Sequence, residues 1–420
     1  MYRVPTATSE DFRRRAPAVL LFALAGVVPQ LSTAAETKPF LPEFPALELR
    51  METRVRYVNI DEGDKPLGTD VTTVRAIAGA SAALTPKLKL TAEVIHSDFV
   101  PPKRFNDNAA VFTSPYPLLP DPRYTGVNEL HLAWTPVEDW SARLGRQSVK
   151  LGNERHISDD NFRQIPLLYD GLLVKGAPMD RAQVTVGQFN RLRLRNGLTE
   201  PMQLTLLEWA MNPWRDVSVA AYAIRHRPQG QASDRFRFGV ADLSNHVVGA
   251  LVDGSVGFGE VRGYYTLNVA DQRSTGDEAA LSARYWRAGV GAGWLGWVVR
   301  ADHEVKGSNG GRYGFQTPLT NQYAFNGNAL AFFDTPMTGL RDSWATLRWE
   351  RGPWSVLSEY HQFRSDVGNR RYGRELDINL TYTIDSRAYV RAQWAHYRPV
   401  IGGFGTSIDK LWLTAGYEIR

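Results

Sequence analysis

The chain has 420 residues, 43% of them hydrophobic, and its mean hydropathy of −0.32 resembles that of a water-soluble protein. Lys and Arg number 49 against 44 Asp and Glu, which gives a net charge of +5, and there is no Cys. No apolar run reaches the roughly 18 residues that a membrane-spanning helix needs, and the lack of Cys excludes both disulfides and a lipid-modified N-terminal cysteine.

The N-terminal 35 residues have the order of a secretory signal peptide. Three arginines at positions 13–15 precede an apolar segment over residues 16–28, and the small residues at 33–35 follow it. A charged region, an apolar region and a small-residue cleavage site are typical of export signals. A buried core helix is the alternative for the apolar segment. We expect a signal peptide over 1–35 and one exported domain over 36–420, for which nucleic acid is not an expected partner.

From residue 47 onward, apolar and polar residues alternate. Between Leu47 and Tyr57 the odd positions are mostly apolar, whereas the even positions carry five charges. The same period of two recurs over residues 375–384, 387–394 and 411–420. A strand with one apolar and one charged face suits a wall between lipid and water. The pattern predicts an all-β protein, a closed antiparallel transmembrane β-barrel of about 18 strands.

The predicted connections alternate between short and long. Short turns are expected at residues 85–87, 135–139, 178–180, 212–215, 253–254, 351–353 and 384–386. Long loops are expected over 99–125, 150–168 and 305–340. This alternation predicts short periplasmic turns and long extracellular loops, with both chain ends on the periplasmic side. Most tryptophans lie beside the short turns, as in an aromatic girdle, and they are Trp134, Trp140, Trp214, Trp294, Trp297, Trp349, Trp354 and Trp394.

Strand alternation also predicts which charged residues face the lumen. The arginines assigned to it are Arg50, Arg54, Arg56, Arg75, Arg143, Arg237, Arg262, Arg284, Arg300, Arg348 and Arg391. The acidic residues assigned to it are Glu48, Glu52, Glu93, Glu129, Glu260, Asp302, Glu350, Glu359 and Asp377. The guanidinium group binds carboxylates in a bidentate manner, so these arginines would form a path for anions. Alternatively, each arginine pairs with a lumenal acid and only stiffens the wall.

A barrel of this size needs a constriction, because wall side chains alone leave a wide aqueous channel. The loop over residues 305–340 is the expected constriction. It contains Gly310 and Gly311, which give flexibility, and aromatic residues at 323, 325, 332 and 333. Its alternative role is an extracellular cap that stays outside the lumen.

Three clusters of short segments stand out along the chain. They are residues 144–147, 151–153, 162–164 and 169–171, then 314–319, 325–327, 335–336 and 339–342, and finally 372–377. Together, in this order, they resemble the alginate-export family of outer-membrane porins. The resemblance covers roughly residues 47–420. It implies an 18-stranded monomeric barrel with an arginine-rich lumen that passes an anionic polysaccharide outward.

Catalytic and metal-binding arrangements are weak in this sequence. Asp302 and His303 are adjacent, so on a strand they face opposite sides. Glu359 and His361 share a face, which is common in a polar lumen. Asp159 and Asp160 could bind Ca²⁺, although a solvated turn explains them as well. We therefore expect no enzyme activity, no cofactor and no metal.

The sequence thus predicts a channel of the bacterial outer membrane that exports an alginate-like anionic polysaccharide. The alternatives are a general anion-selective porin for small organic anions and, third, a barrel enzyme. Expected partners are outer-membrane lipid, lipopolysaccharide and an anionic oligo- or polysaccharide. Docking of periplasmic export proteins at the short turns stays open.

Overall fold

A computed structural model describes residues 47–108, 113–229, 244–276 and 280–419. The predicted signal peptide over 1–35 lies outside these ranges. The strands are β1 (Leu47–Glu62), β2 (Thr69–Thr85), β3 (Leu88–Phe99), β4 (Tyr124–Trp134), β5 (Trp140–Gln147), β6 (Leu168–Met179), β7 (Ala182–Arg193), β8 (Thr199–Trp214), β9 (Val217–Pro228), β10 (Asn245–Phe258), β11 (Val261–Ser274), β12 (Ser282–Trp294), β13 (Trp297–Lys306), β14 (Leu340–Arg351), β15 (Trp354–Arg364), β16 (Arg371–Thr383), β17 (Ala388–Pro399) and β18 (Ile408–Ile419). Two 3₁₀ turns also occur, η3 (Gln322–Ala324) and η4 (Val367–Asn369). None of the described helices is long and apolar enough to cross a membrane.

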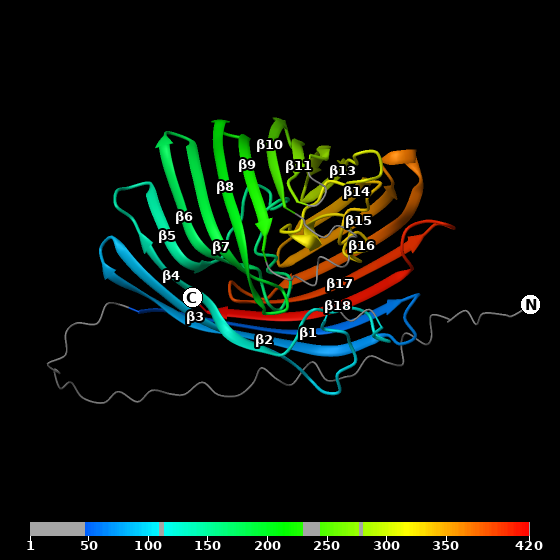
Figure 1. The fold of residues 1–420 in the computed structure, drawn as a ribbon, viewed down its shortest axis with the longest axis horizontal. Helices are drawn as coiled ribbons and strands as arrows, with labels where there is room; N and C mark the ends of the chain where they lie inside the picture. Colours follow the sequence, from blue (N-terminus) through cyan, green and yellow to red (C-terminus); the bar gives the residue numbers. More distant parts are fainter. Residues whose placement is uncertain (1–46, 109–112, 230–243, 277–279, 420) are drawn as a thin grey trace, which may run out of the picture. The chain divides into compact units, whose positions relative to one another are not determined.

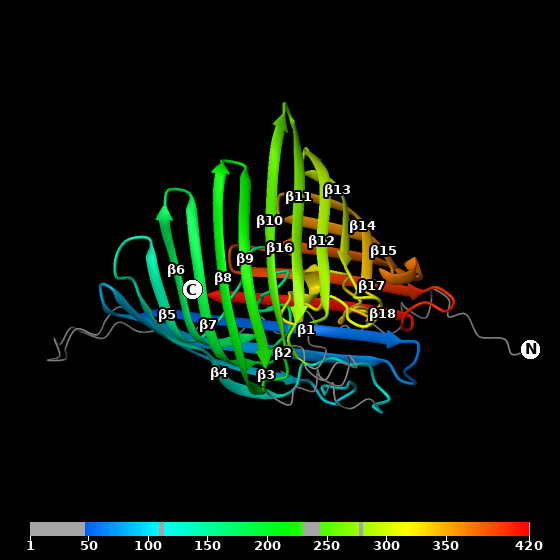
Figure 2. The same ribbon diagram turned by 45° about the horizontal axis from the view of Figure 1, so that its top comes forward.

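The 18 strands form one closed sheet. Each strand pairs antiparallel with its neighbours in the chain, and β1 pairs with both β2 and β18, as the ring of arrows in Figures 1 and 2 shows. Closure leaves no strand edge with unpaired N–H and C=O groups, which would be costly in hydrocarbon. The predicted fold class and strand number are confirmed.

Side-chain exposure follows the alternation that the sequence predicted. On β1, Leu49 is 66% exposed, whereas Arg54 and Arg56 on the other face are buried. Val290 on β12 is 65% exposed in the same way. The outer surface is therefore apolar and the inner surface polar, which is the arrangement of a transmembrane barrel.

Short and long connections lie at opposite ends of the barrel. Eight connections of two to five residues follow the even-numbered strands from β2 to β16. They all lie at the end of the barrel where β1 begins and β18 ends. The predicted turn at 253–254 is wrong, because these residues lie inside β10 and the chain turns after Phe258. The Tyr265 ring packs over Gly254, where a Cβ atom would lie 2.3 Å from Cζ of that ring.

Tryptophans flank the short turns, as expected for an interfacial girdle. The exposed ones at this end are Trp134, Trp140, Trp214, Trp294, Trp297 and Trp354. Trp394 is an exception, because it lies in the middle of β17 opposite Ile378 of β16.

Candidate functional site in the barrel lumen

The loop over residues 307–339 folds into the lumen, as predicted. The yellow segment after β13 lies inside the ring of strands in both views (Figures 1 and 2). Its backbone donates to carboxylates of the wall, with Ala329 N 2.6 Å from Glu375 Oε1 and Asn328 N 3.1 Å from Asp377 Oδ2. The Asn326 side chain donates to Glu304 Oε2 at 2.6 Å. Acidic residues of the inner wall therefore hold this loop in place.

A second loop, residues 148–167, also enters the lumen, and the sequence analysis did not predict this. Arg54 of β1 donates to the carbonyl oxygen of Asn161 at 2.8 Å and to that of Phe162 at 3.2 Å. Arg75 of β2 donates to Asn161 Oδ1 at 2.8 Å and to the carbonyl of Arg163 at 3.1 Å. These two predicted lumen arginines therefore anchor a loop.

The two loops contact each other across the lumen. The rings of Phe162 and Tyr323 are stacked, with centroids 3.4 Å apart. Ser158 N donates to the carbonyl oxygen of Leu319 at 2.8 Å. Burial raises the pKa of Tyr323 to about 12, so its phenol stays neutral at working pH. Two loops in contact with each other therefore enter the lumen, where the sequence analysis expected one.

Beside this contact lies a cavity of about 520 Å³ that is open to the lumen. Its lining combines arginines, aromatic rings, amides and hydroxyls with a single carboxylate, that of Glu359. The cationic and aromatic members of the lining are Arg54, Arg56, Arg348, Arg391, Phe162, Tyr323 and Tyr389. The described part of the lining is therefore rich in positive charge.

Arg56 and Arg391 differ in their partners from Arg54 and Arg348, the other two arginines of the lining, which pair with Glu52 and Glu350. Arg56 Nε donates to Thr414 Oγ1 at 3.1 Å, its Nη1 donates to the carbonyl of Phe162 at 2.8 Å, and its guanidinium lies 4.2 Å from the Phe162 ring centroid. Arg391 Nε donates to Thr381 Oγ1 at 2.9 Å. Among the described residues, no carboxylate oxygen lies within 4.0 Å of either guanidinium. Their positive charge is therefore not cancelled by an ion pair.

Most other predicted arginines face the lumen but have acidic partners. Arg50 is 2.9 Å from Glu93 Oε1 and also contacts Glu52 and Glu418. Arg262 pairs with Asp216 at 2.5 Å, Arg300 with Asp302 at 3.2 Å, and Arg348 with Glu350. Arg143 faces inward on β5, where it lies opposite Leu173 of β6 and Ala133 of β4. The alternative role, in which an arginine pairs with a lumenal acid and stiffens the wall, fits the paired arginines better than it fits Arg56 or Arg391.

One arginine assignment is wrong and one lies outside the described residues. Arg284 is exposed on the outer face of β12, where it lies opposite Asp271. The error arose because both faces of β12 carry apolar or small residues, so its alternation is weak. Arg287 faces the lumen instead and pairs with Asp302 at 2.9 Å. Arg237 lies within residues 230–243, which are not described.

The predicted lumen acids face inward on their strands. Asp302 binds Arg287 and Arg300, Glu52 binds Arg75, and Glu48 pairs with Lys89 at 2.5 Å. Glu129 accepts a hydrogen bond from Ser148 N at 3.1 Å, and Asp377 accepts one from Asn328 N. Glu260 differs, because it lies in the turn after β10 and accepts a hydrogen bond from Trp294 Nε1 at 3.3 Å.

The suggested catalytic and calcium sites have other partners. Asp302 is buried toward the lumen, whereas His303 on the opposite face bonds Ser343 Oγ at 2.7 Å. Asp160 pairs with Arg195 at 2.5 Å and Asp159 with Lys150 at 3.3 Å. The two loop carboxylates are therefore bound to cationic side chains.

A closed sheet with an apolar outer face and a polar lumen defines this chain as a bacterial outer-membrane β-barrel protein. Solved structures of the same fold include OpdL of Pseudomonas aeruginosa, at 12% identity and TM-score 0.66, which covers 89% of this chain and 98% of that chain. OpdK of the same species, solved with vanillate, has 16% identity and a TM-score of 0.66, and the match covers 89% of this chain and 98% of that chain. OccAB4 of Acinetobacter baumannii has 11% identity and a TM-score of 0.66, and the match covers 90% of this chain and 99% of that chain.

No protein-family model matches the chain, and no curated protein matches it in sequence. At such identities the structural likeness shows the fold. It supports an outer-membrane barrel without singling out the alginate-export family that the sequence motifs resemble.

Proposed function

We propose that this barrel is an outer-membrane channel for small organic anions, which pass through the cavity beside Arg56 and Arg391. The observation that carries the proposal is the pair of lumenal guanidiniums whose nearest partners are hydroxyls, a carbonyl and an aromatic ring. A guanidinium with free donors binds a carboxylate in a bidentate manner, and several weak sites allow the anion to leave again.

The volume of the cavity suits a small solute. The cavity of about 520 Å³ is in the range of small-ligand sites, roughly 300–1,000 Å³. The stacked rings of Phe162 and Tyr323 form part of its lining, which suits the planar body of an aromatic carboxylate. OpdK, which shares the fold, was solved with vanillate, a carboxylate of this kind.

The test is single-channel recording of the refolded protein in a planar bilayer across a salt gradient. We expect the reversal potential to show selectivity for anions. Benzoate should block the current at a lower concentration than alginate oligomers do. In the double variant Arg56→Gln with Arg391→Gln, the reversal potential should move toward zero. Benzoate block should weaken by about tenfold or more, since hydrogen bonds to charged groups contribute about 1.5–3 kcal/mol.

The matched control is Arg312→Gln. Arg312 is an exposed arginine of the loop 307–339 that donates to Asn309 Oδ1 and does not line the cavity, so its loss removes one positive charge there, against two in the double variant. Its currents should equal those of the wild type. Cation selectivity of the wild type would reject the proposal, and block by alginate oligomers but not by benzoate would restore the polysaccharide interpretation.

A further inference from the structure

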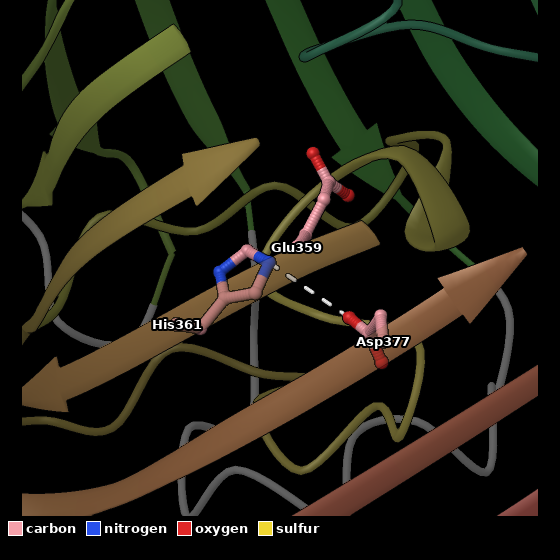
Figure 3. A group of neighbouring side chains, drawn as sticks. All are labelled: Glu359, His361 and Asp377. Atoms are coloured by element: carbon pink, nitrogen blue, oxygen red, sulfur yellow. Dashed lines mark ion pairs between the residues drawn. The ribbon is translucent and has the colours of Figure 1, made fainter. Parts of the chain in front are cut away.

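Three inward side chains on two adjacent strands converge beside the cavity. Glu359 and His361 belong to β15 and Asp377 to β16, where Glu359 is directly opposite Asp377 (Figure 3). Each residue offers one ligand atom, and the three atoms lie within 4.8 Å of one another. His361 is 3% exposed and Asp377 is fully buried. His361 Nε2 is 3.8 Å from Asp377 Oδ2, which is too far for a hydrogen bond.

Asp342 of β14 fixes the orientation of the imidazole. Its Oδ1 and Oδ2 are each 3.0 Å from His361 Nδ1. An ionised carboxylate only accepts hydrogen bonds, so Nδ1 donates, and a cation at Nε2 replaces the proton that this nitrogen carries when the ring is charged. Metal-binding histidines usually donate one ring N–H to a carboxylate in this way and bind the metal through the other nitrogen.

One ligand atom of this group makes no hydrogen bond, and another is shared with a neighbouring acid. Within the described part of the chain, buried His361 Nε2 has no hydrogen-bond partner, and the Asp377 carboxyl is hydrogen-bonded to the Glu375 carboxyl. Buried polar atoms of folded proteins are nearly always hydrogen-bonded. The third ligand, Glu359, receives a hydrogen bond from Thr346 Oγ1 at 2.9 Å and also lines the cavity, which provides a route of entry.

We propose that Glu359, His361 and Asp377 form a binding site for a divalent transition-metal cation of the Zn²⁺ class. One imidazole nitrogen and two carboxylates give three protein ligands and leave a fourth position open to the cavity. Imidazole favours transition metals over Ca²⁺ and Mg²⁺, which prefer six or more oxygen ligands. The site goes beyond the proposed transport function, because its occupancy can be measured without any transport.

The test is calorimetric titration of the full-length barrel in detergent micelles, after removal of bound metal with a chelator. We expect one equivalent of Zn²⁺ to bind, and Ca²⁺ to give no heat at the same concentrations. His361→Asn and Asp377→Asn should each weaken Zn²⁺ binding by about 100-fold or more, since even outer partners of a ligand contribute 10- to 100-fold. The control is His303→Gln, which removes a histidine from the outer face of β13 and should change nothing.

A second measurement does not depend on a ligand variant folding correctly. The Trp344 ring is stacked on His361, with centroids 5.5 Å apart, so bound Co²⁺ should quench its fluorescence. Trp344→Phe should remove the quenched component while Zn²⁺ binding persists. Asp342→Asn should weaken Zn²⁺ binding 10- to 100-fold and change the visible spectrum of bound Co²⁺, and Asp342→Glu should restore both in part. Absence of Zn²⁺ binding by the wild type, or unchanged binding by His361→Asn, would overturn the proposal and leave a proton as the occupant.

Discussion

Replacing Arg155 by Met should release both lumenal loops from the barrel wall. Arg155 lies in the loop 148–167, and its Nη2 is 2.6 Å from Glu304 Oε2 of β13 and 2.9 Å from Asn326 Oδ1 of the loop 307–339. The guanidinium also lies 4.5 Å from the Phe325 ring centroid. One side chain thus connects the two loops to each other and to the wall.

The free-energy cost of removing Arg155 follows from the burial of its ion pair with Glu304. Arg155 and Glu304 are each 1% exposed at the side chain, so this pair resembles a buried ion pair rather than a surface one. Removing one partner of such a pair costs about 3–5 kcal/mol, because the remaining charge is left dehydrated and uncompensated. Even 3 kcal/mol changes the equilibrium between inward and displaced loops by about 100-fold.

Conductance and denaturant unfolding test this prediction. The Arg155→Met channel should have a larger and noisier conductance, and the barrel should unfold at lower denaturant concentration. Adding Glu304→Gln should recover part of both effects, since no charge then stays buried alone. Lys103→Gln is the control, because the exposed Lys103–Asp107 pair should contribute only about 0–1 kcal/mol. If Arg155→Met conducts and unfolds like the wild type, this ion pair does not hold the loops.

Three further predictions follow from single positions. Phe162→Ala removes the ring that stacks on Tyr323 and lies beside the Arg56 guanidinium. Benzoate block in single-channel recordings should therefore weaken about three- to tenfold. An unchanged block would contradict the proposal that benzoate binds in this cavity. Burial and the adjacent Arg155 lower the pKa of His156 to about 3, below the usual value of about 6.5 for an exposed ring. Protons therefore favour the displaced loop, so the inward state keeps its stability above about pH 6.5 and loses it as the pH falls toward 3; conductance should rise over this interval in the wild type and less in His156→Gln. Gly145→Ala should reduce folding yield and midpoint in denaturant, because Gly145 has φ +131° and a Cβ atom would lie 2.2 Å from the carbonyl oxygen of Leu130, whereas Gly352→Ala, with open space around it, should cost less.

The barrel could be predicted from the sequence because its determinant is local. Alternation of apolar and polar residues over one strand, such as residues 47–57, already sets the two faces of the wall. Closure then follows from the need to pair every backbone group in lipid. Strand β12 shows the limit of this reasoning, since apolar and small residues on both faces led to the wrong assignment of Arg284.

The site could be predicted only in part, because it depends on contacts between residues far apart in the chain. Parity places Arg56 and Arg391 in the lumen, but only the structure shows that their partners are Thr414 and Thr381 rather than carboxylates. The sequence likewise shows Glu359 and His361 on one face. It does not reveal Asp342 behind the imidazole, since that contact requires the register between β14 and β15.

The partners of the arginines also make the local positive potential differ between two parts of the lumen wall. On β12 and β13, Arg287 and Arg300 share Asp302, and hydrogen-bonded ion pairs cancel much of their field. On β1 and β17, Arg56 and Arg391 are held by neutral oxygens, which fix the guanidinium without cancelling its charge. The hydrogen bond from Arg56 to the carbonyl oxygen of Phe162 therefore anchors the loop 148–167 and leaves the positive charge of Arg56 in the cavity. An anion entering the lumen gains more from Arg56 and Arg391 than from the paired arginines of β12 and β13, and this difference favours the proposed path along the cavity.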